Sequence, residues 1–137
     1  MLFRSTRAMQ FALKDAKLNT DQIDYINAHG TSTPVGDKAE IDTVAKLFQK
    51  RSRNFSMSST KSSIGHLLGA AGSVEAIYSI LAMRDNVRPA TLNLHNSIEN
   101  HNINLIPNQP QEAKTETCLS NSFGFGGTNA SVIFRKI

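Results

Sequence analysis

The segment at residues 65–85 constrains the fold more than any other part of the chain. Its pattern predicts a helix without a polar side, because its large apolar residues spread around a helical wheel far beyond the roughly 100° stripe of a surface helix. Glu75 is the only carboxylate between residues 65 and 83. The apolar residues are Leu67, Leu68, Val74, Ile77, Tyr78, Ile80, Leu81 and Met83. A single sheet covers one side of such a helix, so we expect a second layer of protein on the other side.

Four small residues near the start of this segment, Gly69, Ala70, Ala71 and Gly72, allow another backbone to come close. Each glycine lowers helix stability by about 1 kcal/mol relative to alanine. The small residues therefore predict a tight helix–helix contact.

Helical and strand-like segments alternate along the chain, which favours an α/β architecture. We expect helices at about 4–17, 37–49 and 65–85, strands at 23–29, 55–59, 117–123 and 130–137, and loops at 30–36 and 60–65. The last two strands flank "GFGGTN" and are predicted to form a β-hairpin that closes a sheet.

The second helix has a start signal and one apolar face. Asp37 is the expected N-cap, with Glu40 three residues on. An apolar stripe follows at helical spacing, formed by Ile41, Val44, Ala45 and Phe48. We therefore expect this helix to have one buried face and one exposed face.

The composition is that of a globular protein, which we interpret as one domain over residues 1–137. Hydrophobic residues make up 39% and charged residues 19%, and no run reaches the roughly 18 apolar residues of a membrane span. The net charge of +4 comes from scattered basic residues, so we expect neither nucleic acid nor membrane as a partner. Residues 1–14 have the composition of a transit peptide, but the helical spacing of Met9, Leu13 and Ala16 favours a surface helix, and we expect a cytoplasmic protein.

The single cysteine, Cys118, excludes an internal disulfide and fits a reducing compartment. Its position in a strand-like run favours a small apolar residue over a reactive thiol.

Two histidines and a lysine lie in Gly-, Ser- and Thr-rich stretches at the ends of predicted elements. His29 follows a strand, His66 stands at the start of the apolar helix, and Lys61 precedes His66 by five residues. An isolated histidine is more often a hydrogen-bonded core residue. Two neutral imidazoles that donate to one carbonyl oxygen would stabilise an enolate, and a nearby ammonium would help keep them neutral. This arrangement suits carbon–carbon chemistry next to a thioester.

Three other site types fit the sequence less well. The four histidines lack recognisable zinc-ligand spacing, so we expect no metal. Ser58 and Lys61 match S-x-x-K without its companion motifs. "GFGGTN" joins two strands where a dinucleotide fingerprint opens a helix. It is read as a glycine turn or as backbone amides aimed at a substrate oxygen.

Three strings, "NAHGTSTPVGDKAE", "STKSSIGHLLGAAGSVEA" and "NSFGFGGTNAS", resemble the C-terminal half of the β-ketoacyl-acyl-carrier-protein synthases, from about residue 7 to the end. The resemblance implies a thiolase-like fold, in which two similar halves stack as five layers, α-β-α-β-α. This chain would be the C-terminal α-β-α half with a mixed sheet. Residues 65–85 would be its central helix.

The resemblance also implies roles for particular residues. His29 and His66 match the two catalytic histidines that hold the malonyl thioester carbonyl and assist decarboxylation. Lys61 matches a lysine that supports the active site electrostatically. Glu75 matches a supporting acid that orders water or an ion nearby.

Two further groups match substrate-binding residues of that family. Thr31 and Thr33 match threonines that contact the pantetheine arm. Phe123, Gly124 and Phe125 match a segment whose second aromatic residue gates the acyl pocket. No cofactor is implied beyond the phosphopantetheine of the acyl carrier protein, which carries the malonyl or acyl cargo.

The chain departs from the family pattern in two ways. The family's nucleophilic cysteine belongs to an N-terminal half that has no counterpart here, and Cys118 matches an ordinary strand residue. Residues 92–107 replace an acid-rich stretch.

We therefore consider two functions. In the first, the chain is the C-terminal part of a condensing enzyme of fatty acid elongation, inactive alone. In the second, it is a non-catalytic remnant or interaction module. Either a homodimer or pairing with a separate N-terminal half would cover the apolar helix.

Overall fold

A mixed sheet organises the computed structural model, which describes residues 2–50, 54–98 and 101–137. Within these residues its four strands follow the order β2 (Ser56–Ser58), β1 (Tyr25–Asn27), β5 (Thr117–Phe123) and β6 (Asn129–Arg135). β1 runs parallel to β2 and to β5, while β5 and β6 pair antiparallel. The predicted α/β architecture and the closing hairpin are confirmed.

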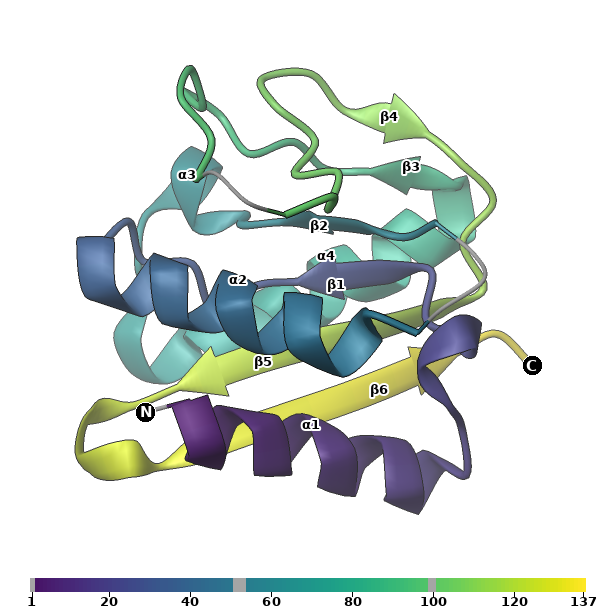
Figure 1. Cartoon of the computed structure of the whole chain (residues 1–137). Coiled ribbons are helices and arrows are strands. Elements are labelled where there is room, and N and C mark those ends of the chain that lie inside the picture. The colour runs from purple at the N-terminus through teal and green to yellow at the C-terminus, as the bar shows by residue number, and fades with distance from the viewer. Residues whose placement is uncertain (1, 51–53, 99–100) are drawn as a thin grey trace.

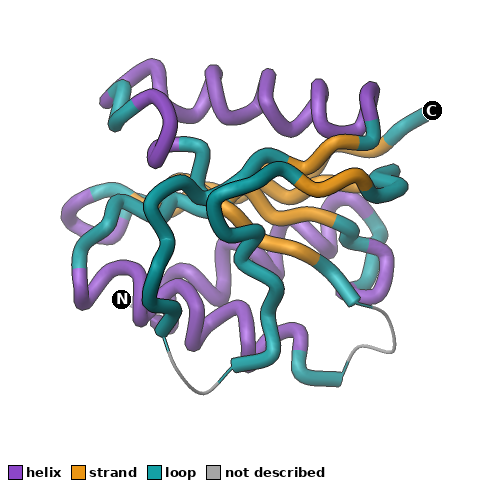
Figure 2. The backbone as a smooth tube through the Cα atoms, turned by 90° about the horizontal axis from the view of Figure 1, so that it is seen from above, coloured by secondary structure: helices purple, strands orange, loops and turns teal. Residues whose placement is uncertain are grey.

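Helices cover both faces of this sheet (Figures 1 and 2). The helices α1 (Leu2–Ala16) and α2 (Pro34–Phe48) lie together on one face, and α4 (Ala71–Asp85) lies on the other. The chain thus forms three layers. Shorter elements complete it: η1 (Thr20–Gln22), α3 (Lys61–Ile64), η2 (Leu68–Ala70), η3 (Phe125–Gly127), and the antiparallel pair β3 (Val87–Arg88) and β4 (Gln111–Glu112).

The two-residue period of the strands divides the core between the two faces. Ile26 and Leu119 pack with buried residues of α1 and α2, while their neighbours Tyr25 and Cys118 pack with Ala82 of α4. The predicted buried stripe of α2 is present, since Ile41, Val44 and Phe48 are buried and Ala45 is partly buried.

The helix α4 buries two polar residues and exposes two large apolar ones. Glu75 and Ser79 are buried together with Ala71, Ala82 and Met83, whereas Ile77 is 56% and Ile80 46% exposed. An ordinary surface helix would keep such large apolar residues on its buried face. The chain covers one side of α4, as predicted, and the second layer that we expect on the other side stays a prediction.

The predicted starts of two helices are wrong. α4 begins at Ala71 where residue 65 was expected, because Leu68 adopts φ +52°, a left-handed conformation that a helix cannot contain. α3 occupies much of the expected loop at 60–65. α2 begins at Pro34, with Thr33 as its N-cap. Proline suits the first helical position because its missing N–H would have no partner there.

Of the small residues at the start of α4, Gly72 makes a close contact with a strand, while the predicted helix–helix contact stays a prediction. A Cβ at this position would lie 3.3 Å from Oγ of Ser122 on β5, while nothing lies within 4 Å of a Cβ at Gly69. Gly72 therefore serves the packing of α4 on the sheet.

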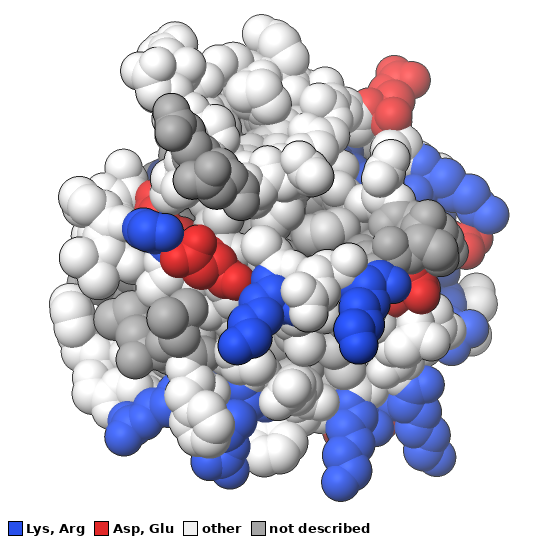
Figure 3. Space-filling model, in the orientation of Figure 1, with Lys and Arg blue, Asp and Glu red and all other residues white. Residues whose placement is uncertain are grey.

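The surface of the α1 and α2 layer carries basic side chains that stand apart from one another, with acidic ones between some of them (Figure 3). The basic side chains on this face are therefore scattered, as they are along the sequence. None of the helices in the described ranges is long and apolar enough to cross a membrane.

Two residues of α1 provide a test of this packing. Met9 is fully buried, whereas Phe11, which is larger, is 59% exposed. We expect Met9→Ala to lower the free energy of unfolding by about 2–5 kcal/mol through the cavity it leaves. Phe11→Ala is expected to cost about 1 kcal/mol or less. Urea denaturation measures both, and a larger loss for Phe11→Ala would contradict the orientation of α1.

Candidate active site

The carboxyl ends of three strands meet at one edge of the sheet, the place where open α/β sheets bind ligands (Figure 1). β1 leads through Ala28 to His29, β2 leads to Lys61 on α3, and β5 ends at Phe123. The fold thus gathers residues that lie far apart in the sequence.

The buried carboxylate of Glu40 holds the backbone that carries His29. Its two oxygens accept the backbone N–H groups of His29 and Gly30, each at 2.9 Å, and Oε1 also accepts Nδ2 of Asn121 at 3.1 Å. Burial raises the pKa of Glu40, and these hydrogen bonds oppose the rise. Glu40 therefore ties α2, β1 and β5 together behind the histidine.

The sequence pattern predicted only a capping role for Glu40, not its role in holding the backbone of His29 and Gly30. A signal existed, because Glu40 precedes Val44 and Phe48 by four and eight residues and shares their buried helix face. A carboxylate on a buried stripe needs hydrogen-bond partners, which here are the backbone of a loop.

Gly30 is required by the close approach of the loop to β2. It adopts φ +33°, and a Cβ there would lie 2.6 Å from the Cβ of Ser59. The hydroxyl of Ser59 donates to the carbonyl of Gly30 at 2.7 Å. This contact fixes the far side of the His29 loop.

The two predicted histidines lie next to each other. The ring centroids of His29 and His66 are 5.6 Å apart with an interplanar angle of 85°. Nδ1 of His66 accepts the backbone N–H of Leu68 at 3.0 Å, which assigns the proton of the neutral ring to Nε2. His66 is exposed in the chain and so offers a donor at the surface of the site.

The environment of His29 keeps its ring neutral. Burial, followed by the positive charge of Lys61 and by His66, lowers its pKa from 6.5 to about 4. Its ring lies 5.9 Å from that of Phe123, and its buried Nδ1 makes no hydrogen bond to any residue that the structure describes. His29 at pH 7 is therefore a neutral hydrogen-bonding group.

Lys61 and Glu75 form a buried ion pair beneath the histidines. The ammonium contacts Oε1 of Glu75, and both side chains are at most 5% exposed. Burial raises the pKa of Glu75, opposed by the ammonium, while Oε2 has no hydrogen-bond partner within the described ranges. The pair brings α3 and α4 together and places a charge near each histidine.

The predicted substrate-binding residues form two groups. Oγ1 of Thr31 lies 3.4 Å from Oγ1 of Thr33, at the N-terminal end of α2. Phe123 contacts His29, while Gly124 and Phe125 are exposed.

The expectation of free amides in the glycine turn fails at two positions. The N–H of Gly124 donates to Thr128 at 2.8 Å, and that of Gly127 donates to Gly124 at 3.3 Å. Both amides are used within the turn.

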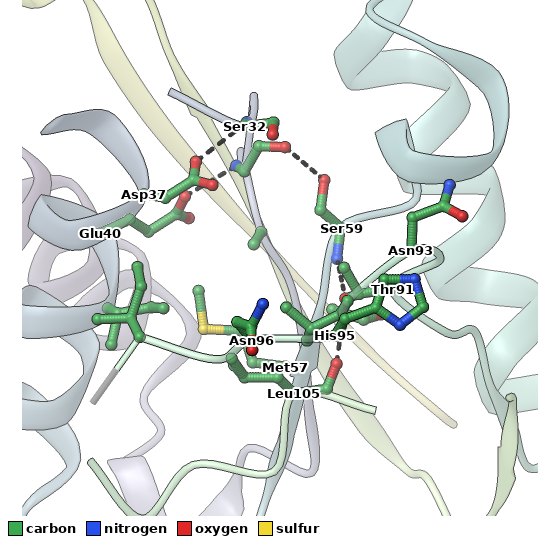
Figure 4. Close-up of a pocket in the computed structure, with 16 residues that line it drawn as sticks. Ser32, Asp37, Glu40, Met57, Ser59, Thr91, Asn93, His95, Asn96 and Leu105 are labelled. Atoms are coloured by element: carbon green, nitrogen blue, oxygen red, sulfur yellow. Dashed lines mark hydrogen bonds between the residues drawn. The ribbon is translucent and has the colours of Figure 1, made fainter. Parts of the chain in front are cut away.

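A cavity of about 390 Å³ lies between the start of α2, the end of β2 and residues 91–98 (Figure 4). Its wall carries hydrogen bonds from the N–H of Ser32 to Asp37 and from the N–H of Ser59 to Thr91. His29 and His66 do not line this cavity, which our sequence analysis did not anticipate. Asp37 was predicted to be the N-cap of α2. It lies within the helix instead and accepts a hydrogen bond from the backbone N–H of Ser32.

Cys118 is a core residue, as predicted. It is fully buried in β5, its Sγ lies 3.5 Å from the carbonyl oxygen of Ser79, and burial raises its pKa to about 12. A thiol with this pKa is almost wholly protonated at pH 7 and is not a nucleophile.

Comparison with known proteins identifies the family of this fold and site. Residues 3–95 match the model of the β-ketoacyl synthase C-terminal domain. The chain therefore belongs to the β-ketoacyl synthase family, as its C-terminal domain.

Among curated relatives, the chain is 55% identical over 130 residues to 3-oxoacyl-[acyl-carrier-protein] synthase 2 of Rhizobium meliloti (strain 1021), covering 95% of the chain and 31% of that protein. It is 46% identical over 132 residues to the synthase of the same name from Coxiella burnetii, covering 96% and 32%. The chain thus spans about a third of the length of these relatives and corresponds to their C-terminal part.

Solved structures show the same thiolase-like architecture. A β-ketoacyl synthase from Burkholderia phymatum STM815 superposes with a TM-score of 0.84 at 41% identity, covering 97% of the chain and 32% of that structure. The ishigamide ketosynthase/chain length factor superposes with a TM-score of 0.91 at 31% identity, again covering 97% of the chain and 32% of that structure. A type II ketosynthase in complex with its acyl-carrier protein gives 0.90 at 28% identity, covering 97% and 33%. The predicted fold class is confirmed.

The neutral state of His29 has a consequence for stability. Between pH 6.5 and 4 the unfolded chain binds a proton at this ring and the folded chain does not, so the free energy of unfolding falls as the pH is lowered. For a half-buried ring screened by solvent, we expect a loss of about 1 kcal/mol between pH 7 and 5. Urea denaturation of the wild type and His29→Asn measures it, because the variant lacks this component. An identical pH dependence of the two proteins would contradict the lowered pKa.

Proposed function

We propose that this chain is the decarboxylating part of a 3-oxoacyl-[acyl-carrier-protein] synthase. The enzyme would join an acyl thioester to malonyl-carrier protein by decarboxylative Claisen condensation, the fatty acid elongation step. The observation that carries the proposal is the neighbouring pair His29 and His66, with the pKa of His29 lowered to about 4. The names of the curated relatives support the same reaction.

In this mechanism the two imidazoles stabilise the charge that decarboxylation creates. The bond between C2 of the malonyl group and its carboxylate breaks, CO2 leaves, and the electron pair becomes an enolate. Its oxygen accepts N–H groups from His29, whose ring is neutral, and from His66. The enolate carbon then attacks the acyl thioester carbonyl and expels a thiolate.

Lys61 and Glu75 would support this step without touching the substrate. The ammonium of Lys61 lowers the pKa of His29, and Glu75 holds the ammonium in place. Thr31 and Thr33 would contact the pantetheine arm, and Phe123, Gly124 and Phe125 would border the acyl group.

The substrates would arrive on the phosphopantetheine of an acyl carrier protein, and no further cofactor is proposed. A structural neighbour was solved in complex with its acyl-carrier protein, which supports such a partner. We expect the reaction to take place in the cytoplasm.

A covering layer for α4 completes the proposal. The exposed Ile77 and Ile80 would pack against a second ketosynthase segment or a second copy of this chain. Two structural neighbours are ketosynthases with a chain length factor, which supports pairing of this general kind.

The histidine pair can be tested in an enzyme reconstituted with a nucleophile-bearing ketosynthase half. We expect His66→Ala to lower the rate of malonyl-carrier-protein decarboxylation by about 10²–10³-fold, the effect of removing one donor to an oxyanion. The matched control is His101→Ala, which removes a histidine that belongs neither to the pair nor to the lining of the nearby cavity and should leave the rate unchanged. Release of labelled CO2 is the measurement. Retained decarboxylation in His66→Ala would place the oxyanion site elsewhere.

The polypeptide of residues 1–137 alone should form no 3-oxoacyl product from acyl- and malonyl-carrier protein. Its only thiol, Cys118, is buried with a pKa of about 12, so it cannot accept the acyl group. Mass spectrometry of the carrier-bound product is the measurement. A 3-oxoacyl product that persists after Cys118→Ala would refute this assignment.

A further inference from the structure

The glycine turn between β5 and β6 is held from outside by the first turn of α1. Nη1 of Arg4 donates a hydrogen bond to the carbonyl oxygen of Gly126 at 2.8 Å, across 122 positions of sequence. Figure 1 shows the start of α1 beside this turn. The link is charge-assisted, the stronger kind of hydrogen bond.

The guanidinium of Arg4 also fills the space above Gly127. A Cβ at Gly127 would overlap the guanidinium, whereas a Cβ at Gly126 would meet nothing within 4 Å. Both glycines adopt positive φ, +73° at Gly126 and +82° at Gly127. A side chain is therefore strained at either position, but only at Gly127 would it also expel Arg4.

A second contact joins the same two segments. With its amide oriented to satisfy its neighbours, Asn129 accepts the backbone N–H of Ser5 at 3.1 Å and donates to the carbonyl of Thr128 at 3.2 Å. Asn129 thus adds a second link between the start of α1 and the strand that leaves the turn.

The turn borders the histidine pair. It begins directly after Phe123, whose ring lies 5.9 Å from His29, and it carries the fully exposed Phe125. No described residue covers the ring of Phe125, so the turn backbone determines where it stands.

We propose that Arg4 is a positioning residue that fastens the glycine turn to α1 and thereby determines the position of the Phe123 ring beside His29. The first turn of α1 and residues 124–129 then form one structural unit. The importance of this unit for catalysis rests on the proposed function, whereas its existence does not.

The test compares Arg4→Ala with Arg7→Ala by NMR of the full chain. Arg7 is the matched control because its guanidinium stacks on Phe3 and Phe11, one turn along the same helix. We expect Arg4→Ala to speed the exchange of the Gly127 amide with water about fivefold to tenfold, as the loss of one charge-assisted hydrogen bond allows. Arg7→Ala should leave the exchange rate of the Gly127 amide unchanged. Neither variant should change the melting temperature.

The NMR signals of the Phe123 and His29 rings show whether Arg4 positions these rings or only stabilises the fold. In Arg4→Ala they should shift, and Arg4→Lys should recover part of the shift because an ammonium retains a donor. Unchanged ring signals and unchanged exchange in Arg4→Ala would overturn the proposal. A drop in melting temperature without a local change would also overturn it.

A double-mutant comparison tests the contact itself. Gly126→Ala introduces backbone strain alone, while Gly127→Ala introduces strain and displaces Arg4. Exchange at the turn should therefore rise more in Gly127→Ala than in Gly126→Ala. In the Arg4→Ala background the two substitutions should have equal effects. A difference that persists without Arg4 would show that the arginine does not hold the turn.

Discussion

The buried ion pair between Lys61 and Glu75 is the contact on which the arrangement of the site depends. A buried charge is costly unless it stays paired, so the pair fixes α3 against α4. It also turns the carboxylate side of α4 toward the sheet and leaves Ile77 and Ile80 outside. His66 follows α3 after Gly65, so the same pair positions the segment that carries the second histidine.

Glu40 has the equivalent role for the first histidine. Its carboxylate holds the backbone of His29 and Gly30 and reaches Asn121 on β5. Two buried acids therefore hold the segments that carry the histidines: Glu40 binds the loop after β1, and Glu75 binds Lys61 on α3. The rings of His29 and His66 lie next to each other at this edge of the sheet.

Much of this organisation could be predicted from local patterns. The helical spacing of Met9 and Leu13 predicted α1, and "GFGGTN" between two strand-like runs predicted the hairpin of β5 and β6. The start of α4 could not be predicted, because leucine gives no signal for the left-handed conformation that Leu68 adopts. The place of Glu40 on the buried face of α2 signalled a need for hydrogen-bond partners, but only the fold identifies them as the backbone N–H groups of His29 and Gly30. The pairing of Lys61 with Glu75 likewise needed the fold.

If the proposed function is right, α4 is an internal helix whose exposed apolar side, at Ile77 and Ile80, is covered by a second layer of protein. Cysteine labelling of Ile77→Cys tests it most directly, because the native Cys118 is buried and unreactive. Val35→Cys on α2, where Val35 is 75% exposed, is the matched control. On assembly with a second ketosynthase segment or a second copy, labelling at position 77 should slow by about tenfold or more while position 35 stays reactive. Equal reactivity of the two positions in the active enzyme would contradict the account.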